Sequence, residues 1–227
     1  MTRTLRVMSK PLVDVSEANR TIEFVYFDLG NVLLSFDRSR GNELLSRRWQ
    51  IEPSAIDAAL NDSGLQERYE HGELEAETVV SELANTVGLP DRKTDVIAIE
   101  LLSDMFTPID GMEAVVKAVR EHMGRVGLLS NTCRGHIDNI LRRHHRDLGD
   151  WFDVSVLSYE HGHMKPDPEI YRIAEEACDH PPERILFLDD RRENVRAAQK
   201  RGWHAHQCWG GPPAIEVLAR YGINPAV

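Results

Sequence analysis

Three short apolar runs constrain the fold of this chain more than any other feature of its sequence. They are IEFVYF (22–27), RVGLLS (125–130) and RILFLDD (184–190). Runs of this length that are apolar on both faces are typical of buried strands in a parallel sheet. Two weaker runs, WFDVSVLS (151–158) and WHAHQCW (203–209), are candidates for further strands.

Helical patterns alternate with these runs in the second half of the chain. Within residues 111–123, apolar side chains recur at the spacing of one helix face. Asp167 and Pro168 have the residue types of a helix N-cap and a first helical position, and Gly202 suits the end of a later helix. Strands that alternate with helices predict an α/β fold, a doubly wound parallel sheet with right-handed crossovers.

One long segment breaks this alternation. Residues 38–108 show helical periodicities, such as the stripe that includes Trp49, and no strand-like run. We therefore predict a small α-helical cap domain at 38–108, inserted into an α/β core domain formed by 22–37 and 109–227. Residues 1–21 show no sustained periodicity, and we interpret them as a polar N-terminal extension.

Composition excludes several classes of function. The 227 residues carry 27 Lys and Arg against 37 Asp and Glu, and this net charge of -10 disfavours nucleic-acid binding. No apolar run is long enough to span a bilayer, and the first residues lack the apolar region of a secretory signal. Cys133, Cys178 and Cys208 lie far apart without a CxxC pair, which is typical of reduced thiols in a cytoplasmic protein. A monomer and a homodimer both stay open.

The three strongest strand candidates all end in polar groups. Asp28 follows the first, Ser130 and Asn131 end the second, and Asp189 and Asp190 end the third. Ligands of open α/β sheets bind at the carboxyl ends of the strands. Carboxylates that converge there repel one another unless a cation lies among them, and Mg²⁺ prefers such oxygen ligands. The alternative is that these Asp residues only form turns and cap helices.

Four segments resemble, in order, the four motifs of haloacid dehalogenase superfamily hydrolases. They are VYFDLGNVLLSFD (25–37), LLSNT (128–132), MKPDPEIY (164–171) and ILFLDDRRENV (185–195). The predicted helical insertion falls where this family carries its smaller cap. The Asp-Leu-Gly-Asn start is similar to a branch that contains sugar-phosphate phosphatases and the phosphatase domain of a bifunctional type of epoxide hydrolase. The resemblance implies the Rossmann-like core of this superfamily.

The resemblance also implies a metal site and a nucleophile. Asp28 would attack phosphorus and form an aspartyl-phosphate. Mg²⁺ would be held by Asp28, the backbone carbonyl of Gly30 and Asp190, with Asp189 acting through a water molecule. Asn194 would orient these groups.

The remaining motif residues would bind the phosphoryl group. Ser130 would donate a hydrogen bond to a phosphoryl oxygen, as would the backbone amide of Asn131. Lys165 would neutralise charge on the nucleophile and on the phosphate. The predicted function is hydrolysis of a small phosphorylated metabolite, such as a sugar phosphate, by a Mg²⁺-dependent phosphatase.

One position departs from the pattern of many phosphatases in this superfamily. They carry a second Asp two residues after the nucleophile as general acid and base, and this chain has Gly30 there. Either another group moves the proton, or the leaving group needs no help, or turnover is slow. Candidate replacements are His136, Asp37 and a polar residue of the cap loop QERYEHGE (66–73).

Two competing functions stay open on the sequence alone. A C–halogen hydrolase would use the same Asp nucleophile without a metal, and it would gain nothing from Asp189 and Asp190. A catalytically weak binding or regulatory protein would have kept the fold and lost turnover. The presence of Asp28, Lys165 and Asp190 argues against that second alternative.

Overall fold

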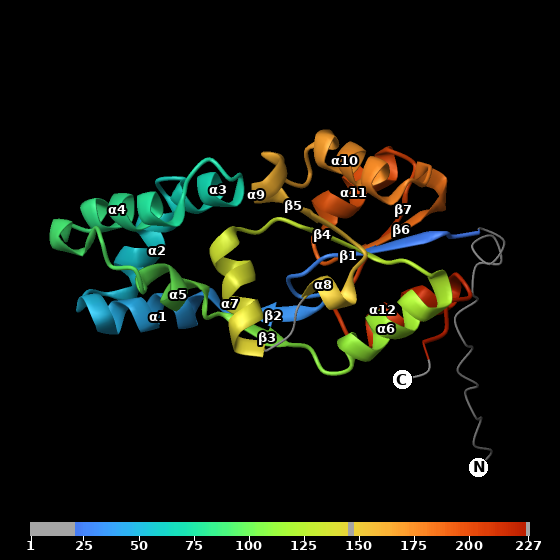
Figure 1. Cartoon of the computed structure of the whole chain (residues 1–227), viewed down its shortest axis with the longest axis horizontal. Coiled ribbons are helices and arrows are strands. Elements are labelled where there is room, and N and C mark those ends of the chain that lie inside the picture. Colours follow the sequence, from blue (N-terminus) through green and yellow to red (C-terminus); the bar gives the residue numbers. More distant parts are fainter. Residues whose placement is uncertain (1–20, 145–147, 226–227) are drawn as a thin grey trace, which may run out of the picture.

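The computed structural model describes residues 21–144 and 148–225. Figure 1 shows two parts side by side, a sheet flanked by helices and a separate group of helices. Apart from Thr21, the expected N-terminal extension lies outside the described residues. Within the described part of the chain, no helix has both the length and the apolar composition needed to cross a membrane.

The larger part is built on a parallel sheet of five strands. β1 (Phe24–Phe27) is central, with β4 (Gly127–Ser130) on one side and β6 (Ile185–Asp189) on the other. The outer strands are β5 (Val154–Leu157) beside β4 and β7 (His204–Gln207) beside β6. All five predicted runs therefore form strands, and the α/β fold class is confirmed.

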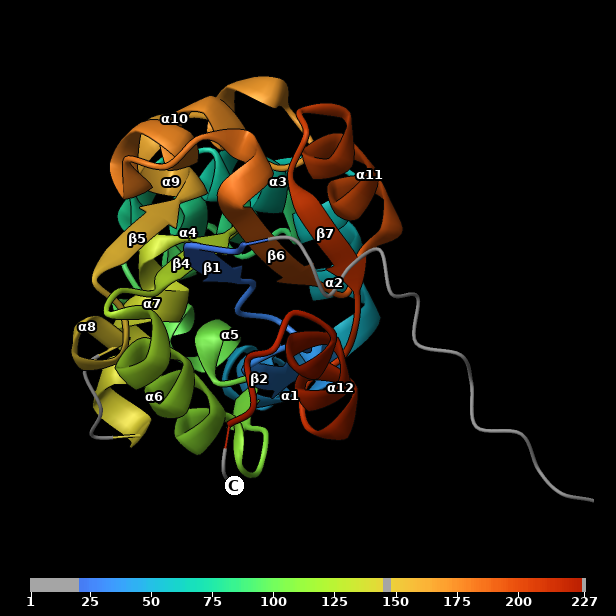
Figure 2. The same cartoon turned by 90° about the vertical axis from the view of Figure 1, so that its right-hand side faces the viewer.

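Helices cover both faces of this sheet (Figure 2). They are α6 (Met112–Met123), α7 (Arg134–His144), α8 (Leu148–Trp151), α9 (Ser158–His161), α10 (Pro168–Cys178), α11 (Arg192–Lys200) and α12 (Pro212–Arg220), with a short 3₁₀ turn η2 (Pro182–Arg184). Val25 and Phe27 pack with α6 and α12, whereas Phe24 and Tyr26 pack with α10 and α11. Successive side chains of a strand point to opposite faces, so an apolar run such as β1 contributes to two cores at once.

The smaller part is helical and has its own apolar core. Its elements are α1 (Arg38–Trp49), α2 (Pro53–Asn61), α3 (Leu65–Glu70), α4 (Ala76–Thr86), η1 (Pro90–Arg92) and α5 (Ala98–Ser103). Leu45, Trp49 and Leu83 are buried in this core together with Cys133, which follows β4 in the larger part. We call this group of helices the cap. Cys133, Cys178 and Cys208 are buried free thiols.

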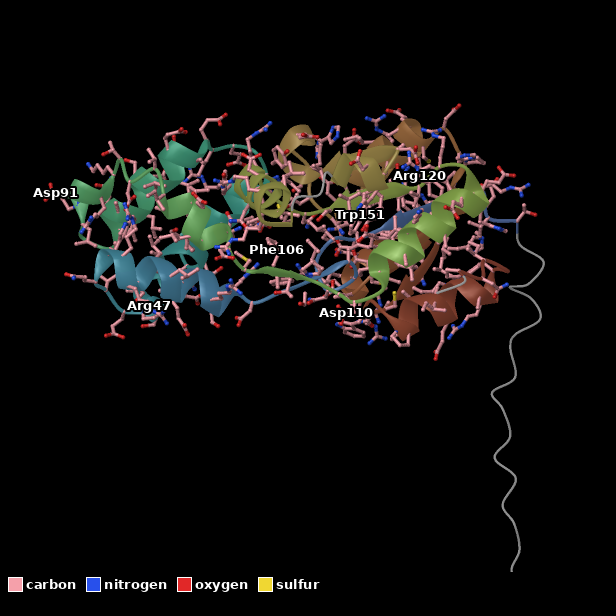
Figure 3. The ribbon with its side chains drawn as sticks, turned by 60° about the horizontal axis from the view of Figure 1, so that its bottom comes forward. Arg47, Asp91, Phe106, Asp110, Arg120 and Trp151 are labelled. Carbon is pink, nitrogen blue, oxygen red and sulfur yellow. The ribbon has the colours of Figure 1, made fainter. Side chains whose placement is uncertain are left out.

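A two-stranded antiparallel ribbon joins the cap to the sheet. It pairs β2 (Leu34–Phe36) with β3 (Phe106–Pro108). The expectation that residues 38–108 hold no strand is therefore wrong at β3. Three residues are too few to show the alternating pattern of a strand, and this segment is extended because Thr107 pairs with Ser35 across the ribbon. Figure 3 shows Phe106 between the cap helices and the rest of the molecule.

Candidate active site

The strand register brings the polar strand ends together at one edge of the sheet. Phe27 pairs with Leu188, and the backbone N–H of Asp28 donates to the Leu188 carbonyl at 2.9 Å. Ser130 is the last residue of β4, on the other side of β1. Carboxylate oxygens of Asp28, Asp189 and Asp190 lie within 4.8 Å of one another. Such a cluster is costly without a positive charge beside it.

Lys165 supplies that charge from the loop before α10. Its ammonium nitrogen Nζ lies 2.8 Å from Oδ1 of Asp28 and 2.7 Å from Oδ2 of Asp189. It also donates to the backbone carbonyl of Leu129 at 2.8 Å. An ammonium group has three N–H donors, so all three have acceptors. The side chain of Lys165 is 1% exposed, which strengthens these interactions because little water screens them.

Asp28, the nucleophile predicted from the sequence, accepts hydrogen bonds on one of its two carboxylate oxygens. Oδ1 of Asp28 accepts from Lys165 and, at 2.7 Å, from the backbone N–H of Leu29. Both hydrogen bonds from described residues fall on Oδ1, which leaves Oδ2 for other chemistry. Burial raises the pKa of Asp28 to about 7, with Asp189 adding to the rise and Lys165 opposing it.

Asp189 has protein donors around both oxygens. Its Oδ1 accepts from the backbone N–H of Arg191 at 2.8 Å, and its Oδ2 accepts from Lys165. The side-chain amide of Asn194 lies 3.1 Å from each oxygen. Asn194 thus contacts the carboxylate cluster, as the sequence suggested. Its own Oδ1 is buried and has no partner among the described residues.

Asp190 is held by Asn31, a residue for which no role was predicted from the sequence. The side-chain amide of Asn31 donates to Oδ2 of Asp190 at 2.9 Å. Asn31 has φ 56°, a left-handed conformation that Asn tolerates better than most residues. Burial raises the pKa of Asp190, and the hydrogen bond from Asn31 opposes the rise. The sequence feature that could have pointed to a role for Asn31 in the site is its position inside the first motif, three residues after Asp28.

Gly30 lines the cleft beside these carboxylates. It forms an isolated bridge with Leu34 and does not have the positive φ that would require glycine. A Cβ added to Gly30 would lie 3.1 Å from the ring of Phe36, which is 37% exposed. A side chain at position 30 would therefore displace a movable ring and not the backbone.

The two residues at the end of β4 have different surroundings. Both polar atoms of the Asn131 side chain bind backbone: Nδ2 donates to the Lys165 carbonyl at 2.8 Å, and Oδ1 accepts from the Lys165 N–H at 2.7 Å. Within the part of the chain that the structure describes, the hydroxyl of Ser130 makes one long contact, 3.5 Å, to the Asn131 carbonyl. Both residues line the cleft, and Ser130 has the less engaged side chain.

These groups surround a cleft of about 110 Å³ between the sheet edge and the cap. The cap and the ribbon contribute Phe36, Arg38, Glu70 and Phe106 to its wall. Of the suggested proton-transfer residues, His136 and Glu70 of the loop 66–73 line the cleft. Asp37 is exposed and instead caps α1, where its carboxylate accepts from the N–H of Ser39 at 2.9 Å.

His136 is buried in the wall of the cleft. Its Nδ1 lies 3.4 Å from Oγ1 of Thr132, and its ring packs edge-on against Phe106 with centroids 5.2 Å apart. Burial, together with the charge of Arg38, lowers the pKa of His136 to about 4. The imidazole is therefore neutral at neutral pH.

The arrangement of fold, motifs and carboxylate cluster defines a class of hydrolase. The family model for haloacid dehalogenase-like hydrolases matches residues 22–202. The chain belongs to this family and is a hydrolase, which confirms the resemblance inferred from the four motifs.

The relatives that the chain matches include proteins named as phosphatases. A phosphorylated carbohydrates phosphatase from Thermotoga maritima is 28% identical over 102 residues, covering 45% of this chain and 46% of that protein. A D-ribitol-5-phosphate phosphatase from Bacteroides thetaiotaomicron is 23% identical over 197 residues, covering 82% of this chain and 91% of that protein. A crystal structure of a family enzyme from Bacteroides thetaiotaomicron, in complex with magnesium and inorganic phosphate, has a TM-score of 0.71 at 23% identity. It covers 86% of this chain and 98% of that chain, so the two share a fold.

Proposed function

We propose that this hydrolase is a Mg²⁺-dependent phosphatase that acts on small phosphorylated metabolites, with Asp28 as nucleophile. The observation that carries the proposal is the cluster of three carboxylates held against the buried ammonium of Lys165. The activities of the phosphorylated carbohydrates phosphatase and of the D-ribitol-5-phosphate phosphatase support phosphorylated carbohydrates as the substrate class.

The donor set of the cluster fits Mg²⁺. Carboxylate and carbonyl oxygens are the ligands that Mg²⁺ prefers, and it commonly keeps several water molecules. Asp28, Asp190 and the carbonyl of Gly30 would hold the ion, and Asp189 would act through a bound water because its own oxygens already have protein donors. The buried Oδ1 of Asn194, which has no partner within 21–144 and 148–225, would accept a hydrogen bond from such a water. When bound, the ion would offset charge on the carboxylates and the phosphoryl group.

The chain's own residues account for the substitution at phosphorus. Asp28 attacks through the oxygen that Lys165 and Leu29 leave free, and the bond from phosphorus to the leaving oxygen breaks as an aspartyl-phosphate forms. The hydroxyl of Ser130 and the backbone N–H of Asn131 donate to phosphoryl oxygens, which carry the developing charge. Lys165 contacts Oδ1 of Asp28 and would balance its charge, and its contact with the phosphate stays a prediction.

We further propose that residues 38–108 act as a cap domain that selects the substrate, over a core of 22–37 and 109–227. A second cavity of about 30 Å³ lies within the cap and shares Arg38 and His136 with the cleft. Its wall includes polar side chains, among them Asn42, Asp57 and Gln66. Polar groups around so small a space favour a compact, hydroxylated substrate.

A screen of phosphorylated metabolites tests this function. Phosphate release would be measured for sugar phosphates, polyol phosphates and nucleotides in Mg²⁺ and in chelator, with Asp28→Asn as the blank. We expect release that needs Mg²⁺ and is absent from the blank. Chelator-insensitive release of halide from 2-haloacids would favour a C–halogen hydrolase, and no turnover of any compound would favour a binding protein.

A further inference from the structure

The proposed reaction needs a proton for the departing alkoxide, and Gly30 has no side chain to give one. Asp37 lies outside the cleft wall and is engaged in capping α1. His136 lines the cleft, but it is neutral at neutral pH and releases no proton there readily. The remaining candidate is a residue of the cap loop.

The end of α3 is fixed against the catalytic edge of the sheet. The hydroxyl of Ser158, the first residue of α9, donates to the backbone carbonyl of Glu70 at 2.6 Å. The same hydroxyl accepts from the backbone N–H of Thr132 at 2.9 Å, two residues after Ser130. Ser158 thus ties the backbone of Glu70 to the loop that carries the second motif. Figure 1 shows α3 beside α9 at this junction.

Two further contacts hold the same stretch of cap. The N–H of Gly135 donates to the phenol oxygen of Tyr69 at 3.1 Å. Gly72 packs so closely against α9 that an added Cβ would lie 2.1 Å from the Tyr159 carbonyl oxygen, and its φ is +76°. No side chain fits there, so the loop lies directly on α9. Glu70 is between these two contacts, and its position over the cleft is therefore well defined.

The carboxyl group of Glu70 has the surroundings of a proton-transfer group. Glu70 lines the cleft together with Asp28, Ser130 and Lys165. The side-chain amide of Gln66 donates to its Oε1 at 2.7 Å, which orients the carboxyl group and leaves Oε2 to carry a proton.

Three charged groups, each on a different part of the fold or one turn away, influence the pKa of Glu70. Arg38 begins α1, Arg191 precedes α11, and Glu67 lies one turn earlier on α3. Burial is the largest influence and raises the pKa of Glu70, with Glu67 adding to the rise and Gln66, Arg38 and Arg191 opposing it. A carboxyl group with a raised pKa keeps its proton closer to neutral pH, as a general acid must.

We propose that Glu70 is the general acid and base that the cap delivers to the active site. The proposal rests on the phosphatase function proposed above. As the phosphorus–oxygen bond of the substrate breaks, the Glu70 carboxyl group gives its proton to the leaving oxygen. A water molecule then attacks the aspartyl-phosphate and gives its proton to the Glu70 carboxylate, which frees Asp28 and restores the acid.

Pre-steady-state kinetics of Glu70→Gln test the assignment. The amide has nearly the same shape but cannot donate an acidic proton, and Glu77→Gln, at an exposed position of α4 in the cap, is the matched control. With an alkyl phosphate, Glu70→Gln should slow alcohol release by about 10²- to 10⁴-fold. With 4-nitrophenyl phosphate, the first equivalent of nitrophenolate should appear at close to the wild-type rate and later turnovers should slow. Glu77→Gln should resemble wild type with both substrates.

A pH profile provides the second measurement. In wild type, alcohol release from the alkyl phosphate should fall as pH rises and Glu70 loses its proton, and this limb should vanish in Glu70→Gln. If Glu70→Gln slowed the first step equally with the alkyl and the aryl phosphate, or changed KM alone, the proposal would be overturned. Either result would indicate that Glu70 binds the substrate and does not transfer a proton. If Glu70→Gln does not fold, Glu70→Asp keeps a carboxyl group and should retain the acid limb, whereas a profile without that limb would overturn the assignment. Absence of phosphate release by wild type would instead refute the phosphatase function itself.

Discussion

The ammonium nitrogen of Lys165 lies 2.8 Å from the Oδ1 atom of Asp28, with both residues buried. The same nitrogen contacts Asp189 and the Leu129 carbonyl, so its three donors are occupied before any substrate arrives. Lys165 therefore stabilises the carboxylate cluster itself, and its removal should affect the folded protein as well as the reaction.

We expect Lys165→Met to destabilise the protein in chelator. The substitution leaves buried carboxylates without their cation, and breaking a buried ion pair in this way costs about 3–5 kcal/mol. Urea unfolding in chelator and in Mg²⁺ measures the loss, and Mg²⁺ should restore part of it by replacing the missing charge. Lys117→Met, on the exposed face of α6, is the control. Equal stability of the two variants would contradict the account.

The stabilising effect of Mg²⁺ should increase with pH. The pKa of Asp28 is raised to about 7 in the metal-free fold, above the ordinary carboxyl value of about 4. The stability contributed by this group is therefore full below about pH 4 and is lost as pH rises through about 7. Mg²⁺ binds the ionised form, so its shift of the melting temperature should be larger at pH 8 than at pH 6.

Asp190→Ala should remove the Mg²⁺ shift at both pH values, because it deletes a ligand of the proposed site. Asp179→Ala, at the far end of α10, should keep it. A melting temperature of wild type that is indifferent to Mg²⁺ and chelator would count against the metal site.

A carboxyl group at position 30 should replace Glu70. The φ of Gly30 is compatible with a side chain, and an added Cβ meets the partly exposed ring of Phe36 at 3.1 Å. In the Glu70→Gln background, Gly30→Asp should raise alkyl phosphate turnover about tenfold or more, which corresponds to about 1.4 kcal/mol off the barrier. The first turnover of 4-nitrophenyl phosphate reports whether the site is intact. A normal first turnover of 4-nitrophenyl phosphate by the double variant, without faster turnover of the alkyl phosphate, would refute this prediction.

Ser158→Ala should loosen the cap from the sheet. The substitution leaves the Glu70 carbonyl and the Thr132 N–H without their partner at a buried position, and each unsatisfied group costs about 1–3 kcal/mol. Urea unfolding should show a loss of at least about 1 kcal/mol, whereas Ser155→Ala, at an exposed position of β5, should have little effect. Indistinguishable unfolding curves would show that Ser158 does not hold the cap.

The sheet and the carboxylate cluster were predictable because local sequence patterns determine them. An apolar run such as IEFVYF has one stable place, the interior of a parallel sheet, and its end fixes where Asp28 lies. Parallel strands end at the same edge, so Asp189 and Asp190 had to approach Asp28.

Features that depend on contacts between distant segments were not predictable. β3 is a strand because it pairs with β2, although the whole cap separates the two in the sequence. The bond from Asn31 to Asp190 and the bond from Ser158 to Glu70 join parts of the chain that no periodicity connects. For the same reason, the sequence left His136, Asp37 and the loop 66–73 open as proton donors, and only the three-dimensional contacts led us to propose Glu70.

Phosphate release by Asp28→Asn tests the central claim most directly. The variant would be compared with wild type and with Asp37→Asn, which changes an exposed Asp outside the cleft wall, on the best phosphomonoester and in saturating Mg²⁺. Folding of all three would be checked by thermal unfolding. We expect Asp37→Asn to turn over like wild type and Asp28→Asn to release no phosphate, because an amide cannot form the aspartyl-phosphate. Turnover by a folded Asp28→Asn variant within tenfold of wild type would contradict the account.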